Sequence, residues 1–236
     1  MSTDQKVVIV TGATQGIGAD LVKGYRDRNY RVIANSRSIK PSSDPDVLNV
    51  AGDIADPATA ERIVLQGLDR FGRIDTLVNN AGIFIAKPFV DHSEEDYASI
   101  VAINLGGFFR LTKRVAAEML RQGSGHIVQI TTSLVAHPNS SVPAVLAAMT
   151  KGGLNAATRS LAIEYAPRNI RVNAVSPGII KTPMHAAETH EFLSKLHPVG
   201  RMGESRDIVD AVLYLENAPF VTGEILHVDG GQSAGH

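Results

Sequence analysis

The sequence predicts an α/β fold, in which a single domain over residues 1–236 is built on a doubly wound parallel sheet of about seven strands with helices on both faces. Short apolar runs that suit buried strands alternate along the chain with amphipathic stretches that suit helices. Strands that are apolar on both sides and are joined by helical crossovers form a parallel sheet covered on both faces. Such folds bind ligands at the carboxyl ends of their strands.

Local patterns place the individual elements. The first helix carries Ile17, Leu21 and Tyr25 on one face, because residues four apart in a helix are neighbours. A later helix begins at Asp56–Pro57, where an N-cap residue precedes a proline in the first turn. The expected strands are Val7–Val10, Arg31–Ala34, Val47–Val50, Thr76–Val78, His126–Thr131, Ile170–Val175 and Glu224–Val228. The expected helices are Ile17–Arg28, 56–71, Ser93–Arg121, Pro143–Tyr165 and Glu204–Leu215.

The segment Pro183–Gly203 interrupts this alternation, and we expect it to form a mobile lid over the site. It contains His185, His190 and His197, whose spacing resembles that of metal ligands only superficially. Neither a carboxylate cluster nor a cysteine accompanies them, as a metal site would require. We therefore expect solvated lid residues there and no metal site.

The composition excludes several classes of protein. The chain has 23 basic and 24 acidic residues, and its net charge of −1 gives no field that attracts nucleic acid or an anionic membrane. It has no cysteine, which excludes disulfides, thiolate metal sites and a cysteine nucleophile. No apolar run approaches the ~18 residues of a membrane span. We expect a cytoplasmic protein that acts on a small molecule.

A glycine-rich turn, Thr11–Gly18 (TGATQGIG), lies between the first expected strand and the first helix. Glycines allow the backbone to approach a pyrophosphate, and a helix N-terminus adds N–H donors and a positive dipole. Taken alone, the segment fits an ordinary tight turn between a strand and a helix equally well.

Further motifs follow this turn in a fixed order: Asp53, Asn79–Gly82, Asn104, Lys151–Gly153, Arg171–Gly178 and Val228–Gly231. Together with the turn, they resemble the classical short-chain dehydrogenase/reductase family over nearly the whole chain. The resemblance implies a Rossmann-like fold and hydride transfer with a nicotinamide cofactor.

The resemblance also assigns residues to the cofactor. The glycine turn would hold the pyrophosphate, Asp53 and Ile54 the adenine, and Pro177–Gly178 the nicotinamide. Without the resemblance, Asp53 would be a turn former at a strand end. The full set of expected cofactor residues is Gly12, Thr14, Gln15, Gly16, Ile17, Gly18, Ser36, Arg37, Asp53, Ile54, Asn80, Ala81, Gly82, Lys151, Pro177, Gly178, Ile180 and Thr182.

The end of the second strand favours NADP(H) over NAD(H). Ser36 stands where NAD-binding relatives carry an acid, and Arg37 follows it. Ser36 can donate to a 2′-phosphate, and Arg37 can pair with it. Gln15 stands where NADP-binding relatives often carry a basic residue, which weakens the preference for NADP(H).

The family's catalytic set is Asn, Ser, Tyr and Lys, and one member has no counterpart in this sequence. Lys151 and Asn104 match the lysine and the asparagine, but Ala147 stands four residues before Lys151, where the tyrosine is expected. None of the five tyrosines, at positions 25, 30, 97, 165 and 214, falls between 98 and 164. Counting by strand parity from Ile130 puts Thr132 at the serine position, and Ser133 is the alternative.

Several groups are candidates to replace the missing acid. His137 follows the fifth strand at the expected mouth of the substrate site, where a histidine can transfer protons, although an exposed loop histidine beside Pro138 is the more common situation. Tyr97 shares a face with Asn104, but an aromatic residue there more often belongs to the core. A water held by Asn104, Lys151 and Thr132 is another candidate, and a protonated imine substrate would need no acid.

Two functions follow from these observations. The first is an NADP(H)-dependent oxidoreductase that acts on a small apolar carbonyl, alcohol or imine with an altered proton donor. The second is a cofactor-binding but non-catalytic relative that serves as a sensor or as a partner in an oligomer. The resemblance further implies a homotetramer or homodimer, formed through the C-terminal run Phe220–Gly231 and through the helices within Ser93–Arg121 and Pro143–Tyr165.

Overall fold

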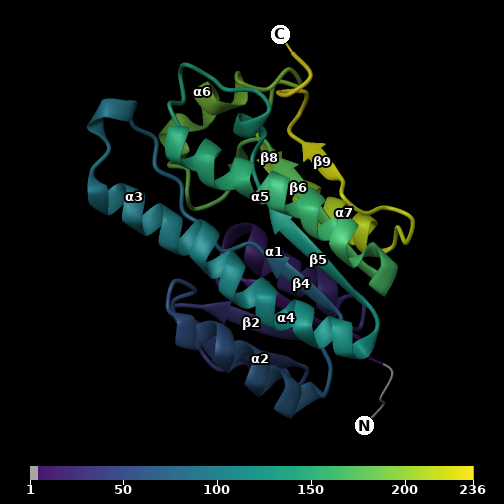
Figure 1. Ribbon diagram of the computed structural model, residues 1–236. Coiled ribbons are helices and arrows are strands. Elements are labelled where there is room, and N and C mark those ends of the chain that lie inside the picture. The colour runs from purple at the N-terminus through teal and green to yellow at the C-terminus, as the bar shows by residue number, and fades with distance from the viewer. Residues whose placement is uncertain (1–4, 236) are drawn as a thin grey trace.

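The centre of the fold is a parallel sheet of seven strands in the order β3-β2-β1-β4-β5-β6-β9 (Figure 1). The computed structural model describes residues 5–235. Strand order runs outward in both directions from β1, which is the doubly wound arrangement expected from the sequence. The strands are β1 (Val7–Thr11), β2 (Arg31–Ser36), β3 (Val47–Ala51), β4 (Thr76–Asn79), β5 (Gly125–Ile130), β6 (Ile170–Pro177) and β9 (Ile225–Val228).

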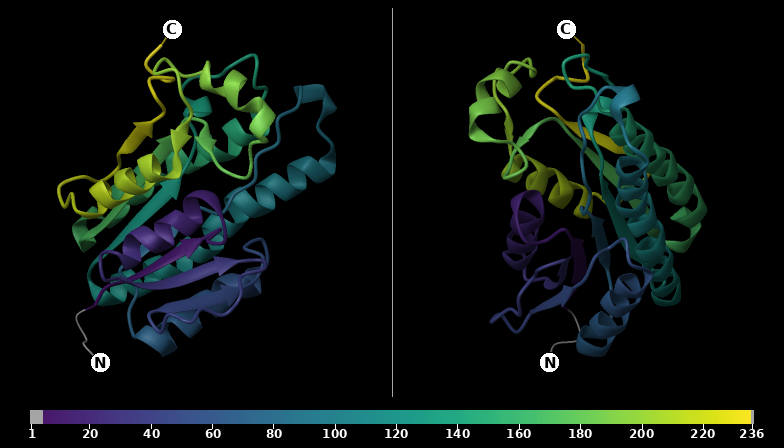
Figure 2. Two further views of the ribbon diagram at one scale, coloured as in Figure 1. Left: turned by 180° about the vertical axis from the view of Figure 1, so that it is seen from behind. Right: turned by 90° about the vertical axis from the view of Figure 1, so that its left-hand side faces the viewer.

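Helices cover both faces of the sheet, as the right-hand view of Figure 2 shows. One face carries α1 (Gly16–Arg26) and α7 (Ser205–Glu216), and the other carries α2 (Pro57–Phe71), α4 (Phe108–Gln122) and α5 (Val145–Tyr165). Each face has its own apolar core, because the strands are apolar on both sides. Leu21 and Val212 belong to the first core, and Ile63, Val115 and Ala162 belong to the second.

Helix α2 shows how the sequence fixes an element. The Asp56 carboxylate accepts a hydrogen bond from the Ala58 N–H at 3.0 Å, and Pro57 occupies the first turn. Gly72, with φ of 78°, ends the helix in a left-handed conformation that costs glycine little. The expected range, 56–71, agrees with the observed one.

The expected helix Ser93–Arg121 is interrupted, which corrects the sequence prediction. Ser93 caps it as expected, but α3 (Glu94–Ile100) passes into a π-helical segment, η2 (Val101–Gly107), before α4 begins. A π-helix closes its hydrogen bonds over five residues instead of four. The apolar pattern does not reveal it. Asn104 lies within this segment, and its side chain is hydrogen-bonded to the backbone of Ile83.

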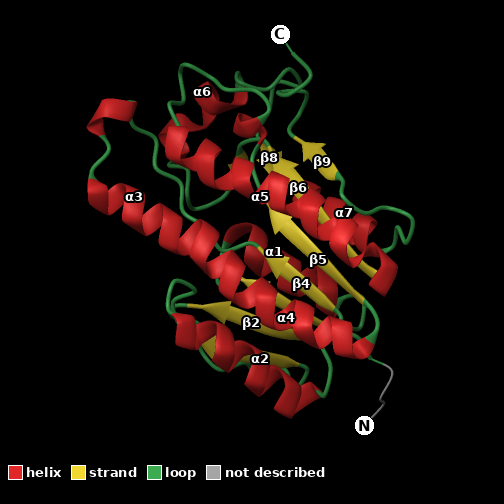
Figure 3. Ribbon diagram, in the orientation of Figure 1, coloured by secondary structure: helices red, strands yellow, loops and turns green. Residues whose placement is uncertain are grey.

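Two short strands that the sequence did not predict flank the 183–203 segment. β7 (Ile180–Lys181) pairs in parallel with β8 (Gly203–Glu204), and the segment between them holds the short helix α6 (His190–Ser194). Figure 3 shows α6 and its loops beyond the arrowhead of β6. The pairing fixes the two ends of the segment at the carboxyl edge of the main sheet.

A buried polar cluster lies at the opposite, amino-terminal ends of the strands. The Glu216 carboxylate accepts hydrogen bonds from His126 Nδ1 at 2.8 Å, from Thr76 Oγ1 at 3.1 Å and from Tyr30 Oη at 3.1 Å. Burial alone would raise the pKa of Glu216, but the hydrogen bonds from His126 and Thr76 and the charge of Lys6 outweigh it and leave the pKa below its usual value. Burial lowers the pKa of His126, so its ring donates as a neutral imidazole.

Among the described residues, no helix is both long and apolar enough to span a bilayer.

Candidate functional site

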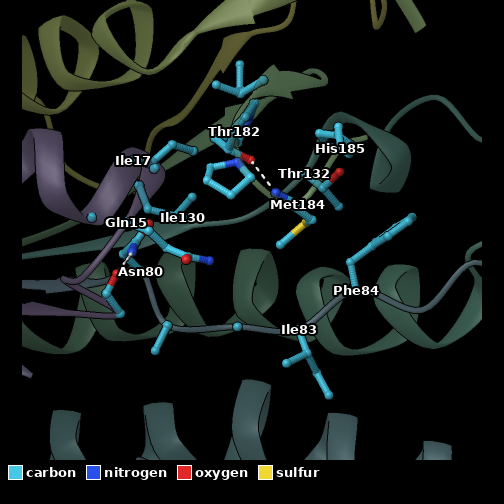
Figure 4. A pocket seen from close by; sticks show the side chains of 18 of the residues that line it. Gln15, Ile17, Asn80, Ile83, Phe84, Ile130, Thr132, Thr182, Met184 and His185 are labelled. Carbon is cyan, nitrogen blue, oxygen red and sulfur yellow. Dashed lines mark hydrogen bonds between the residues drawn. The ribbon is translucent and has the colours of Figure 1, made fainter. Parts of the chain in front are cut away.

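A cavity of about 840 Å³ opens at the carboxyl ends of the strands, and the 183–203 segment forms part of its wall (Figure 4). It gathers residues that are far apart in the sequence, and every residue expected to bind the cofactor lines it. These residues are Gly12, Thr14, Gln15, Gly16, Ile17, Gly18, Ser36, Arg37, Asp53, Ile54, Asn80, Ala81, Gly82, Lys151, Pro177, Gly178, Ile180 and Thr182.

The N-terminus of α1 faces this cavity with its backbone donors uncapped. Gln15 is the N-cap residue and makes no side-chain hydrogen bond to the helix, and the first turn contains no acidic residue. The first backbone N–H groups of a helix lack partners within it, and its dipole favours an anion there. Gly12 and Gly16 have φ values of 66° and 52°, which favour glycine. These features fit a pyrophosphate.

Asn80 and Gly18 hold the glycine turn in place. Asn80 Nδ2 donates to the Thr11 carbonyl oxygen at 2.9 Å, which ties the end of β4 to the turn. A Cβ atom at Gly18 would lie 2.1 Å from the Gly12 carbonyl oxygen, so no larger residue fits. Both residues therefore shape the turn itself, besides lining the cavity.

The end of β2 forms a polar corner of the cavity. Thr14 Oγ1 and Ser36 Oγ lie 3.0 Å apart and share a hydrogen bond. Arg37 is exposed and lines the cavity next to them. Asp53 Oδ1 accepts from the Ala55 N–H at 2.9 Å, which orients its carboxylate at the same end of the cavity. This corner carries the groups that an adenosine ribose and its substituents need.

Lys151 and Ala147 lie four residues apart on α5, and both line the cavity. Lys151 Nζ donates to the Ile130 carbonyl oxygen at 2.6 Å. Burial lowers the pKa of Lys151 to about 8, because removal from water disfavours the charged ammonium. A lysine in this state holds its proton at pH 7 and gives it up readily.

Asn104 lies next to Lys151 but behind the cavity wall. Its Oδ1 accepts from the Ile83 N–H at 3.0 Å, and its Nδ2 donates to the Ile83 carbonyl oxygen and to Thr150 Oγ1, both at 3.1 Å. A Cβ atom at Gly82 would lie 3.1 Å from Lys151 Nζ and 3.2 Å from Asn104 Oδ1. Asn104 therefore fixes the backbone at Ile83 beside the lysine.

Three hydroxyl residues follow β5, and Thr131, the first, lines the cavity while its Oγ1 donates to the Val175 carbonyl oxygen at 3.2 Å. The other two, Thr132 and Ser133, point in different directions. Thr132 lines the cavity, and its Oγ1 accepts from the Leu134 N–H at 3.4 Å. Ser133 is 1% exposed and donates to Gln232 Oε1 at 2.6 Å. The structure thus brings Thr132 to the cavity and keeps Ser133, which begins a short 3₁₀ helix (Ser133–Val135), out of it. His137, half-buried before α5, is likewise not among the residues that line the cavity.

The cavity also has an apolar wall, which sequence reasoning missed in part. The described side chains there are Ile83, Phe84, Leu134, Val142, Met184, Phe192 and Leu193. Ile83 and Phe84 directly follow the Asn79–Gly82 motif, which could have pointed to them, whereas the residues of the 183–203 segment carry no such signal.

Ionisable groups are few in the cavity. The described lining residues of this kind are Arg37, Asp53, Lys151 and His185, and no tyrosine is among them. Burial and the neighbouring His190 lower the pKa of His185, which leaves it a neutral imidazole at pH 7. The sequence assigned His185 to a solvated lid, but the structure makes it part of the cavity wall.

The histidines of the 183–203 segment do not converge. Over residues 5–235, no group of three or more potential metal ligands is found. His197 corrects the expectation of solvated residues, since it is only 3% exposed and its ring is held by two backbone groups.

Comparison with known proteins agrees with this site. The family model described as enoyl-(acyl carrier protein) reductase matches residues 12–233. The chain is 35% identical to a putative ketoacyl reductase of granaticin polyketide synthase from Streptomyces violaceoruber, over 98% of both chains. It is 34% identical to the 3-oxoacyl-[acyl-carrier-protein] reductase FabG of Thermotoga maritima, over 98% of this chain and 99% of that one.

Solved structures give the same result. ElxO with NADP bound superposes with a TM-score of 0.91 at 27% identity, over 98% of this chain and 100% of that one. A 3-ketoacyl-(acyl-carrier-protein) reductase from Brucella melitensis, complexed with NADH, superposes with a TM-score of 0.90 at 29% identity and the same coverage. By motifs, fold and relatives together, the chain belongs to the classical short-chain dehydrogenase/reductase family of oxidoreductases.

Proposed function

We propose that this protein is an NADP(H)-dependent oxidoreductase that reduces a small apolar carbonyl or imine, or oxidises the corresponding alcohol or amine, with a proton donor other than tyrosine. The observation that carries the proposal is the single cavity in which the cofactor-binding residues meet Lys151, Thr132 and an apolar wall. The comparisons support the reaction class, since relatives include carbonyl reductases.

The cofactor would lie along the line from Ser36 to Pro177. Ser36 and Arg37 would contact the 2′-phosphate of the adenosine ribose, and the uncapped end of α1 would hold the pyrophosphate. Bound there, the dinucleotide supplies or accepts the hydride. Solved relatives hold NADP or NADH, and the preference for NADP(H) rests on Ser36 and Arg37.

The apolar wall favours a small uncharged substrate. Phe84, Met184 and Phe192 offer apolar surface and no charge to balance an ionic group. The 183–203 segment supplies several of these side chains, so we propose that it acts as the lid over the bound substrate. Closure would keep water away from the reacting atoms.

Lys151 and Thr132 would together take the role of proton donor, which the tyrosine has in other members of the family. Ala147 puts no hydroxyl into the cavity at the position four residues before the lysine. The Thr132 hydroxyl would donate a hydrogen bond to the substrate oxygen. Lys151 Nζ, with its pKa lowered to about 8, would then give a proton to that oxygen directly or through Thr132.

The test combines binding with turnover. Fluorescence titration should show NADPH binding to the wild-type protein, and a panel of ketones, aldehydes and imines should show NADPH oxidation with at least one of them. Lys151→Ala should reduce that turnover by about 10²–10⁴-fold, the range that a positioned acid supplies. His137→Ala should lower it far less, because His137 does not line the cavity. Absence of turnover on the whole panel would count against catalysis.

A second candidate function is cofactor binding without catalysis, as a sensor or as an oligomer partner. The absence of tyrosine from the described cavity lining favours it. A tyrosine-to-phenylalanine variant of ElxO, whose fold matches with a TM-score of 0.90, holds NADPH, so a lost tyrosine hydroxyl does not prevent binding in that protein. Tight NADPH binding without hydride transfer would support this alternative.

We also propose that the chain assembles with copies of itself. Phe109 on α4 and Met149 and Ile163 on α5 are 62%, 56% and 78% exposed, which leaves large apolar side chains in water on one layer of the fold. A homodimer or homotetramer would cover them. Light scattering that shows a monomer at micromolar concentration would contradict this proposal.

A further inference from the structure

His197 joins two parts of the cavity wall through its two ring nitrogens. It lies between α6 and β8 and is 3% exposed. Its Nε2 accepts a hydrogen bond from the Ile179 N–H at 2.9 Å, and its Nδ1 donates to the Leu193 carbonyl oxygen at 3.0 Å. Ile179 and Leu193 both line the cavity. The imidazole belongs to the 183–203 segment, so its bond from Ile179 ties that segment to the cavity floor after β6, while its bond to Leu193 fixes the ring to α6 within the segment.

The two partners fix the protonation state of the ring. A backbone N–H only donates, so the nitrogen facing Ile179 must carry a lone pair. A carbonyl oxygen only accepts, so the nitrogen facing Leu193 must carry the hydrogen. His197 is therefore neutral, in the tautomer with hydrogen on Nδ1. An imidazolium would place a second N–H against the Ile179 N–H and break this contact.

The ring also packs closely on the loop that would face the nicotinamide. A Cβ atom at Gly178 would lie 2.8 Å from His197 Nε2, and one at Gly230 would lie 3.3 Å from His197 Cβ. The loop 177–179 and the ring are thus in direct contact on one side, while α6 holds the ring from the other. Neither part can shift far without moving the imidazole.

We propose that His197 is a positioning residue that couples the nicotinamide-facing loop 177–179 to the lid segment 183–203, and that the coupling holds only while its imidazole is neutral. The proposal rests on the proposed function for its account of what the loop and the lid bind. The tie between loop and lid is itself a property of the free protein and can be tested without any ligand.

The groups around His197 make the coupling sensitive to acid. Burial, the largest effect, lowers its pKa, and the charge of Arg201 adds to this effect; the backbone carbonyls of Leu193 and Ser194 and the charge of Asp229 oppose it. Asp207 and Asp210 line a smaller cavity with His197, and Asp207 is paired with Arg201 at 3.0 Å. Because its pKa lies below the usual value of a histidine, the ring is neutral at pH 7, and the coupling should fail on acidification.

Two carboxamide substitutions separate the two hydrogen bonds. In His197→Asn, the amide nitrogen takes the place of Nδ1 and keeps the bond to Leu193, but leaves the Ile179 N–H without an acceptor. In His197→Gln, the amide oxygen takes the place of Nε2 and keeps the bond from Ile179, but releases Leu193. A purely structural role would make both variants weaken the same properties.

Two readouts follow the two sides of the coupling. The dissociation constant for NADPH reports on the loop. The rate of trypsin cleavage after Lys195 reports on the lid. This side chain lies between Leu193 and His197 and is 70% exposed. Cleavage after Arg121 on α4 serves as the internal reference. We expect His197→Asn to weaken NADPH binding about tenfold, in line with one unsatisfied buried donor, with lid cleavage near the wild-type rate. His197→Gln should speed lid cleavage about tenfold and keep NADPH affinity near that of the wild type.

The same change in both variants, or no change in either, would overturn the proposal. If neither variant folds, the wild-type protein still decides. Assigned imidazole ¹⁵N spectra must show His197 in the Nδ1–H tautomer at pH 7.5, a tautomer also expected of His126, whose Nδ1 donates to Glu216. Trypsin cleavage after Lys195 must accelerate only as the His197 ring protonates. A protonated or Nε2–H ring at His197 would overturn it. If NADPH fails to bind at all, the proposed function is wrong. The rate of cleavage after Lys195 and the tautomer of His197 still test the coupling between the loop and the lid.

Discussion

The Ser133 hydroxyl donates a 2.6 Å hydrogen bond to Gln232 Oε1, behind the cavity wall and away from the reacting groups. Both residues are fully buried, so the bond joins the loop after β5 to the C-terminal segment. The neighbouring Thr132 lines the cavity instead, and the hydroxyl of Thr131, which lines it too, already donates to the Val175 carbonyl oxygen. We expect Thr132 to act in the reaction and Ser133 to stabilise the fold, and substitutions of the two residues should distinguish these roles.

Removal of the Thr132 hydroxyl should slow the reaction more than it destabilises the fold. Thr132→Val keeps the shape of the side chain but takes away the donor to the substrate oxygen, and loss of one such donor typically costs about 10²–10³-fold in kcat. Steady-state kinetics on the best substrate, with thermal unfolding measured alongside, provide the check. Unaltered kcat in Thr132→Val would remove Thr132 from the mechanism.

Ser133→Ala, as the matched control, should act mainly on stability. The substitution leaves buried Gln232 Oε1 without its donor, which costs about 1–3 kcal/mol. Chemical denaturation should show this loss, and kcat should fall far less than in Thr132→Val. If Ser133→Ala instead lowered kcat more than Thr132→Val does, Ser133 and not Thr132 would be the hydroxyl that acts in the reaction.

Ala147→Tyr should restore the family's usual acid. A tyrosine four residues before Lys151 faces the cavity with the lysine, and a positioned acid supplies about 10²–10⁴-fold in rate. If the native protein is non-catalytic, this substitution should create ketone reduction. If it instead lowers a native activity, Ala147 makes room for the natural substrate. NADPH oxidation with the carbonyl panel tells these outcomes apart.

The pH dependence of reduction should follow Lys151. The acid form is the donor, and the pKa of Lys151 is about 8, so kcat for reduction should be level below pH 8 and fall about tenfold per unit above it. Single-turnover kinetics with NADPH between pH 6 and 10 measure this. A rate that instead rises as the pH falls below 6.5 would point to His185, which takes up its proton only there.

Arg37→Ala should change cofactor selectivity. Without the guanidinium, NADPH affinity should fall by about 1.5–3 kcal/mol, the worth of a hydrogen bond to a charged group, while NADH affinity should stay nearly constant because NADH lacks the 2′-phosphate. Titration of both cofactors against both proteins is the measurement. The preference for NADP(H) would be contradicted if the wild-type chain bound NADH more tightly than NADPH and if the variant altered neither affinity.

Glu216→Gln should destabilise the fold and spare the cavity. Glu216 lies at the other ends of the strands, and its charged carboxylate holds several buried donors, so the variant should lose about 1.5–3 kcal/mol at pH 7. Because the pKa of Glu216 is depressed in the fold, its contribution is present above about pH 4.5 and is lost as the pH falls through the folded value. Denaturation at several pH values should show the difference shrinking in acid, with NADPH affinity constant at pH 7.

The sheet could be predicted because its signals are local, whereas the residues that line the cavity were singled out by the resemblance of the ordered motifs to the family. The glycine turn is one short run between a strand and a helix, and each strand carries its own apolar run. Thr132 followed from the alternation of side chains along an extended chain. These patterns need no knowledge of distant contacts.

The features that sequence reasoning missed depend on distant partners. Ser133 donates a hydrogen bond to Gln232, and the ring of His197 accepts one from the Ile179 N–H. Asn104, within the π-helical segment, accepts one from the Ile83 N–H. No spacing within the local sequence indicates any of these.

The π-helical segment η2 also has a consequence for how the chain tolerates changes of length. Each residue turns an α-helix by about 100°, since a full turn takes 3.6 residues. A deletion between 101 and 107 that restored a regular helix would therefore rotate α3 against α4 by about that angle and carry Asn104 away from Ile83. Substitutions in this stretch leave the rotation intact. Conservation of length, more than of residue identity, is therefore the trait to look for here when related chains are compared.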